Sequence, residues 1–260
     1  MFARTAFWFF SCIGAAIWLI PAHAQTPVAQ APAAAPAPAA KPAAKPMQRK
    51  MLPVDEGGGD ATWVQFRGWL LEVLRREDRR ALAGIIDGNV LNPLEAPRGI
   101  AAFRKLWDLE GTDKRLLQDL SAALQMGSAW YQPKKSVRLL CAPYVPIKWP
   151  LDDVDPYDSG AITVKDALVK DGPSHMAGTL GNLSYDIIGV RDWEVADKDT
   201  QSQQRWVKVR YAGAAAARDG FVPAEHIRSA VEYRACFART TAGWRLMEYV
   251  LGIEYLGGED

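Results

Sequence analysis

Hydrophobic residues recur at every third or fourth position through much of residues 60–125, and this spacing places them on one face of an α-helix. The first run contains Trp63 and Phe66, and Asp60 stands before it where a helix N-cap is expected. Glycine, proline or aspartate separates this run from similar runs at 82–86, 100–107 and 116–124. The pattern therefore predicts a succession of helices in residues 52–133, with their apolar stripes in a core.

A period of two replaces this pattern in the second half of the chain. Residues 136–145 are apolar and β-branched at their start, which predicts a strand. Alternating segments separated by turn residues then continue from 160 to 230, as in a small barrel. Two final strands, at 231–238 and 244–251, flank a short turn at 240–243, and this arrangement predicts a β-hairpin.

Several short motifs follow one another within residues 160–230. They read DALVKDGPS at 166–174, GTL at 178–180, YDIIGV at 185–190, WVKV at 206–209 and DGFV at 219–222. In this order they resemble the motifs of a bacterial SH3-like domain, although Leu168, Lys170 and Phe221 stand where Asn, Arg and Trp are usual. The resemblance implies a small β-barrel that binds a partner. Such domains occur in exported proteins, often contact peptidoglycan and frequently accompany a hydrolase.

The strand at 136–145 has no neighbouring strand in the sequence, and the terminal hairpin lies beyond the expected end of the barrel. Both need a sheet partner, so we expect them to pair with each other. The predicted fold class is α+β, in which a helical N-terminal part, residues 52–150, is completed by the C-terminal β-hairpin at 231–257. The small SH3-like β-barrel at 160–230 is inserted between these two parts.

Residues 1–24 have the pattern of a secretory signal peptide, with Arg4 before an apolar stretch and the small residues of AHA at its end. The apolar stretch is short for a membrane span, although an uncleaved anchor is the alternative. Residues 25–51 are rich in alanine and proline, which predicts a disordered linker. We expect cleavage near Ala24 and a periplasmic or secreted protein without a stable membrane span.

Charge and composition narrow the choice of partner. The chain has 31 Lys+Arg against 30 Asp+Glu, and nucleic-acid binding would need a basic excess, so we expect no nucleic-acid partner. Only 3 His and 3 Cys are present, and we expect no metal and no cofactor. The acidic stretch at 152–158 lacks the spacing of a calcium loop, because Pro156 interrupts it and Val164 stands where a bidentate Glu is needed.

Four aromatic residues of the 160–230 segment are candidates for ligand binding: Tyr185, Trp193, Trp206 and Phe221. Exposed rings on a small barrel would offer stacking surfaces to a ligand. For Trp206 and Phe221 the alternative is a place in the barrel core, since aromatic residues on short strands commonly point inward. Trp193 is the better surface candidate because it stands beside a polar insertion.

Cys141 and Cys236 remain after removal of the signal peptide, which contains Cys12. Both lie on strands that we expect to pair, and an even number of cysteines in an oxidising compartment permits a disulfide. Unbonded cysteines also pack well in apolar strands, so the sequence leaves both states open.

The sequence does not contain a recognisable catalytic motif. Cys141, His175 and His226 follow the chain order of a cell-wall cysteine peptidase, but Cys141 stands in an extended apolar run without a helix or a basic neighbour to stabilise a thiolate. We therefore expect a non-catalytic cell-envelope protein that binds peptidoglycan or an envelope protein through its SH3-like domain. The alternative is an enzyme or a small-ligand carrier, with a pocket between the helical part and the terminal sheet.

Overall fold

The computed structural model of the chain describes residues 49–133, 137–199, 202–213, 216–254 and 256. In these residues, 12 strands form two sheets and are accompanied by 5 α-helices and two 3-10 turns. No helix of this part is long and apolar enough to cross a membrane. The predicted signal peptide and nearly all of the predicted linker lie outside the described residues.

The first sheet combines strands from both ends of the described chain. Its five strands lie in the order β1 (Ile86–Leu91), β12 (Gly243–Leu251), β11 (Tyr233–Thr240), β3 (Leu139–Ala142) and β2 (Ala129–Tyr131). Only the β1–β12 pair is parallel, and the other neighbours are antiparallel. The terminal hairpin β11–β12 thus extends a sheet to which the 139–142 strand also belongs.

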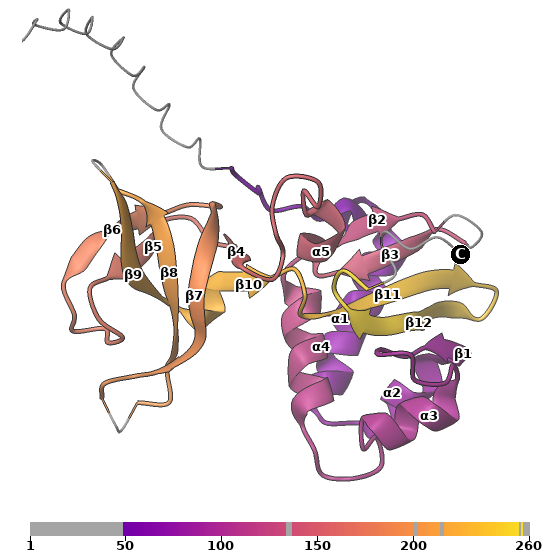
Figure 1. Cartoon of the computed structure of the whole chain (residues 1–260). Coiled ribbons are helices and arrows are strands. Elements are labelled where there is room, and N and C mark those ends of the chain that lie inside the picture. Colours follow the sequence, from indigo (N-terminus) through magenta and orange to yellow (C-terminus); the bar gives the residue numbers. More distant parts are fainter. Residues whose placement is uncertain (1–48, 134–136, 200–201, 214–215, 255, 257–260) are drawn as a thin grey trace, which may run out of the picture. The chain divides into compact units, whose positions relative to one another are not determined.

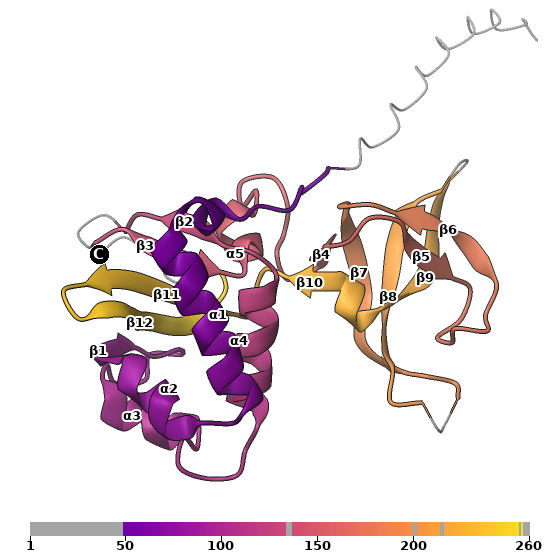
Figure 2. The same cartoon turned by 180° about the vertical axis from the view of Figure 1, so that it is seen from behind.

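Helices α1 (Ala61–Arg75) and α4 (Arg115–Gln125) cover one face of this sheet (Figures 1 and 2). The Asp60 side chain caps α1 and accepts hydrogen bonds from the backbone N–H groups of Thr62 and Trp63. The face of α1 that carries Trp63 packs into one core with α4 and with Phe237 of β11. The shorter helices α2 (Arg79–Ile85) and α3 (Ile100–Leu106) flank β1 in the chain.

The second sheet has seven antiparallel strands. Their order is β10 (Ile227–Ser229), β4 (Ser159–Ile162), β7 (Ile187–Ala196), β8 (Arg205–Ala212), β9 (Ala217–Pro223), β5 (Ala167–Lys170) and β6 (Thr179–Leu183). A 3-10 turn, η2 (Ala224–His226), leads into β10. Alternate residues of these strands, including Val169, Val209 and Val222, form a separate core.

A third, smaller core joins α5 (Tyr144–Lys148) to the beginning of the second sheet. It contains Tyr144 and Val145 of α5 together with Ala161 of β4 and Ile187 of β7. A 3-10 turn, η1 (Glu56–Gly59), precedes α1.

The predicted α+β fold class is wrong. Helices make up 26% of the structure, which is mostly β, and the described part of residues 52–150 contains the strands β1, β2 and β3 as well as helices. Helical periodicity revealed the long apolar faces but not these short strands, because their partners are remote. Ile86 of β1, for example, lies opposite Leu246 of β12.

The predicted small SH3-like β-barrel is also corrected by the structure. In the described residues, the seven-stranded sheet is not closed, since its outer strands β10 and β6 are not paired with each other. Alternation of apolar and polar residues predicts strands and their two faces. Closure depends in addition on the tilt and stagger of the strands, and local alternation does not encode either.

Candidate functional site

A groove with a volume of about 1570 Å³ is lined by α4 and by the strands β7, β8 and β10. The end of α1, Tyr144 of α5 and Tyr233 of β11 complete its walls. Aromatic, aliphatic and charged side chains line the groove together, so it can offer both apolar contact and hydrogen bonds to a ligand.

Trp193 is the aromatic side chain that the second sheet contributes to the groove. The register between β7 and β8 shifts on both sides of Asp192, which marks an irregular stretch of β7. The half-buried Trp193 ring packs over Gly160 of β4 and beside Ile227 of β10. A Cβ atom at position 160 would lie 2.8 Å from Trp193 Cη2, so glycine is what leaves room for the ring.

Tyr144 lines the groove and has a buried hydroxyl group. Its side chain is only 1% exposed, and the hydroxyl has no hydrogen-bond partner among the described residues. Burial raises the pKa of Tyr144 to about 12, and the nearby Tyr185 acts in the same direction. The hydroxyl therefore stays protonated and can donate or accept a hydrogen bond. A buried polar atom without a hydrogen-bond partner is uncommon in folded proteins.

Asp119 is a half-buried carboxylate on the α4 wall of the groove. No described residue donates a hydrogen bond to it or pairs with it. Burial raises the pKa of the Asp119 carboxyl, while the positive charges of Arg228 and Arg115 act against this rise. A carboxylate with a raised pKa in a groove is typical of functional sites.

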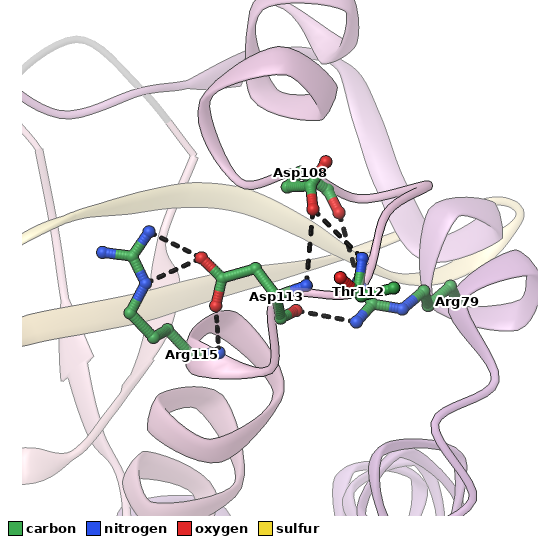
Figure 3. Close-up of polar contacts among 5 residues, drawn as sticks. All are labelled: Arg79, Asp108, Thr112, Asp113 and Arg115. Carbon is green, nitrogen blue, oxygen red and sulfur yellow. Dashed lines mark hydrogen bonds and ion pairs between the residues drawn. The ribbon is translucent and has the colours of Figure 1, made fainter.

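Figure 3 shows how the chain before α4 holds Arg115. Asp113 accepts hydrogen bonds from Arg115 Nε at 2.7 Å and from the Arg115 backbone N–H at 2.9 Å, so the guanidinium is in an ion pair with Asp113. Arg79 of α2 donates to the Asp113 carbonyl oxygen at 2.7 Å, and the Asp108 carboxylate accepts from the backbone N–H of Thr112 at 3.1 Å. These contacts fix the loop that begins α4.

Arg228, the other cation near Asp119, is also engaged. It forms an ion pair with Glu232, and its second terminal nitrogen donates to the Tyr233 carbonyl oxygen at 3.1 Å. The Tyr233 ring stacks on Tyr249 at 5.3 Å between centroids. Burial and the charge of Asp119 raise the pKa of Tyr233, so its hydroxyl stays neutral beside the carboxylate.

The four aromatic candidates occupy different environments. Trp193 lines the groove, whereas Trp206 is fully buried and its Nε1 donates to Asp197 at 2.9 Å. Phe221 is half-buried and lies opposite Lys208 and Lys170 in the sheet. Tyr185 is half-buried at a φ of 60°, and its carbonyl oxygen accepts a hydrogen bond from Met51. The structure therefore brings only Trp193 to the groove.

Sequence reasoning missed Asp119, Tyr144, Arg228 and Tyr233. The one available signal was the position of Asp119 within the apolar stripe of α4, between Leu116 and Leu120. The other three side chains reach the groove through contacts between segments that are distant in the sequence, and periodicity does not reveal such contacts.

Cys141 of β3 and Cys236 of β11 lie opposite each other and form a disulfide with an S–S distance of 2.06 Å. Within the described part of the chain, no group of three or more His, Cys, Asp or Glu side chains could hold a metal ion.

Comparison of the chain with protein-family models finds no match, and comparisons with curated proteins and with solved structures find none either. The resemblance of residues 160–230 to bacterial SH3-like domains therefore rests on the quoted motifs alone.

Proposed function

We propose that this chain is an exported, non-catalytic binding protein of the cell envelope, and that its groove holds a segment of peptidoglycan. The observation that carries the proposal is that one groove is lined by Trp193 and by Tyr144, whose buried hydroxyl has no partner among the described residues. A sugar ring has an apolar face that stacks on an indole and hydroxyl groups that need hydrogen-bond partners.

The size of the groove favours a polymer over a small molecule. Pockets for single small ligands typically occupy about 300–1,000 Å³. At about 1570 Å³ the groove exceeds that range, so it suits several consecutive units of an extended chain. Polar side chains of α4, among them Gln118, Ser121 and Gln125, add hydrogen-bonding groups along its length.

Export is supported by two independent features. Residues 1–24 carry the sequence pattern of a signal peptide, and Cys141 and Cys236 are joined by a disulfide. Structural disulfides persist in the periplasm and outside the cell, and are rare in the reducing cytosol.

The test is a co-sedimentation assay of residues 25–260 with purified insoluble peptidoglycan. Trp193→Ala is expected to weaken retention at least about tenfold, as the loss of a central aromatic contact does in other interfaces. The matched control is Trp69→Ala, because Trp69 is 44% exposed on α1 and does not line the groove. Failure of the unaltered protein to sediment with peptidoglycan would overturn the proposal.

A second candidate function is catalysis at Asp119, and the raised pKa of this carboxyl in the groove is the observation that favours it. Release of soluble fragments from peptidoglycan, lost in Asp119→Asn, would support an enzyme. Binding without any release would support the binding protein.

A further inference from the structure

The cations and the carboxylates that line the groove differ in how many of them have an ion-pair partner. Every cation in its lining is already in an ion pair with a carboxylate. The pairs are Lys114 with Glu77 at 2.5 Å, Arg205 with Glu194 at 3.3 Å, Arg75 with Glu72 at 2.6 Å, and Arg228 with Glu232. An anionic ligand that bound one of these cations would be repelled by the carboxylate already paired with it.

Two carboxylates of the lining, Asp119 and Glu225, have no ion-pair partner among the described residues. Glu225 accepts a hydrogen bond from the neutral Gln204 amide at 2.5 Å. Asp119 accepts none from the described residues. The uncompensated charge in the groove is therefore negative.

Of these two carboxylates, Asp119 has the surroundings that better suit a cationic ligand. The two guanidinium groups near it, on Arg115 and Arg228, each form an ion pair with another carboxylate, that of Asp113 and that of Glu232. Tyr233 of β11 also lines the groove, and the Asp119 charge acts on its hydroxyl group. A carboxylate without an ion-pair partner suits an ammonium group, which would form an ion pair and charge-assisted hydrogen bonds with it.

We infer that the groove selects a ligand that carries a primary ammonium group, and that Asp119 binds this group. The inference deepens the proposed function and rests on it, because it assigns the amino groups of peptidoglycan stem peptides to Asp119 while the glycan contacts Trp193. Tyr144 lines the same groove, and its buried hydroxyl has no hydrogen-bond partner among the described residues.

The first experiment compares native peptidoglycan with peptidoglycan whose amino groups have been acetylated. Acetylation removes the positive charge and leaves the glycan intact, so retention of the unaltered protein is expected to fall about tenfold. Asp119→Asn is expected to bind native material about as weakly as the unaltered protein binds acetylated material. Asp152→Asn is the matched control, because Asp152 is exposed and lies outside the groove lining.

A soluble probe separates this inference from the proposed function. The unaltered protein and Asp119→Asn would be titrated with 1,5-diaminopentane and with its diacetyl derivative, using NMR chemical shifts as the readout. Binding of the diamine alone, lost in Asp119→Asn, supports the ammonium site even if no form sediments with peptidoglycan, and the proposed function would then fail by itself. Equal binding of both probes, equal binding by both proteins, or no binding of the diamine would overturn the inference. Retention on peptidoglycan that depends on Trp193 would in that case still support the proposed function.

Discussion

Cys141 and Cys236 lie opposite each other on the neighbouring strands β3 and β11, and their disulfide closes a loop across a sequence separation of 95 residues. All seven strands of the second sheet belong to this loop. The bond therefore fixes, within the first sheet, the two points at which the chain leaves for the second sheet and returns from it. Both cysteines are fully buried.

Replacing Cys141 and Cys236 together by alanine is expected to lower the free energy of unfolding by about 2–5 kcal/mol, because the unfolded chain would lose a restraint on a long loop. Urea unfolding followed by tryptophan fluorescence measures this change. A midpoint equal to that of the oxidised, unaltered protein would contradict the expectation.

Asp119→Asn is expected to stabilise the protein at neutral pH. Because burial raises the pKa of this carboxyl, its ionisation costs more in the folded protein than in the unfolded chain. The penalty is present above the raised folded pKa and disappears below the unfolded pKa. Thermal unfolding from pH 7 down to pH 3 should therefore show a higher midpoint for the variant at pH 7 and convergence in acid. If the variant were less stable than the unaltered protein at pH 7, a favourable contact of the Asp119 carboxylate would outweigh the cost of its burial, and the expectation would be wrong.

The effect of Glu56→Gln on stability is expected to have the opposite sign to that of Asp119→Asn at neutral pH, and likewise to vanish in acid. Lys148 donates to one Glu56 oxygen at 2.8 Å and the Trp130 backbone N–H to the other at 2.6 Å, and these contacts lower the pKa of Glu56. Its contribution to stability is present above the unfolded pKa and is lost as the pH falls through the lowered folded pKa. The variant should be less stable at neutral pH and equal in acid, in the same series of thermal melts. A constant difference at all pH values would assign the loss to packing.

Arg234→Met is expected to destabilise the protein by about 3–5 kcal/mol, because it leaves the largely buried Glu248 carboxylate without the guanidinium that pairs with it. Arg234 is fully buried, and one of its terminal nitrogens donates to the carbonyl oxygens of Leu251, Gly252 and Glu254. Burial lowers the pKa of Arg234 and raises that of Glu248, so desolvation outweighs their mutual attraction at both groups.

Urea unfolding of the Arg234→Met/Glu248→Gln double variant provides the control for this pair. It should recover part of the loss, since no unpaired charge is then buried. If the loss of unfolding free energy in the double variant equalled the sum of the losses in Arg234→Met and Glu248→Gln, the ion pair itself would contribute nothing to stability.

Gly160→Ala is expected to weaken peptidoglycan retention and to destabilise the protein by about 1–3 kcal/mol, because its methyl group would overlap the Trp193 ring and Ile227. Gly181→Ala is the matched control on a strand of the same sheet, where a Cβ atom meets nothing within 4 Å. Co-sedimentation and urea unfolding of both variants check the expectation. Unchanged retention by Gly160→Ala would show that the position of the Trp193 ring does not matter for binding.

The sequence by itself determined the local features of this protein. The apolar spacing around Trp63 predicted α1 and its buried face, and Asp60 was correctly identified as its N-cap. The alternation at 231–251 predicted the terminal hairpin, which is present as β11 and β12. These features depend on contacts within one turn of helix or across one short turn, so the residues that decide them are close together in the chain.

Only the tertiary structure decided the fold class and the groove. Ile86 becomes part of a strand because Leu246 lies beside it, and the second sheet stays open because β6 and β10 do not meet. Asp119 is one of 30 Asp+Glu residues in the sequence. It differs from the paired acids of the groove because the two guanidinium groups near it form ion pairs with Asp113 and Glu232 instead. Strand partners, burial and unpaired charge are set by residues far apart in the chain, and local periodicity contains no information about them.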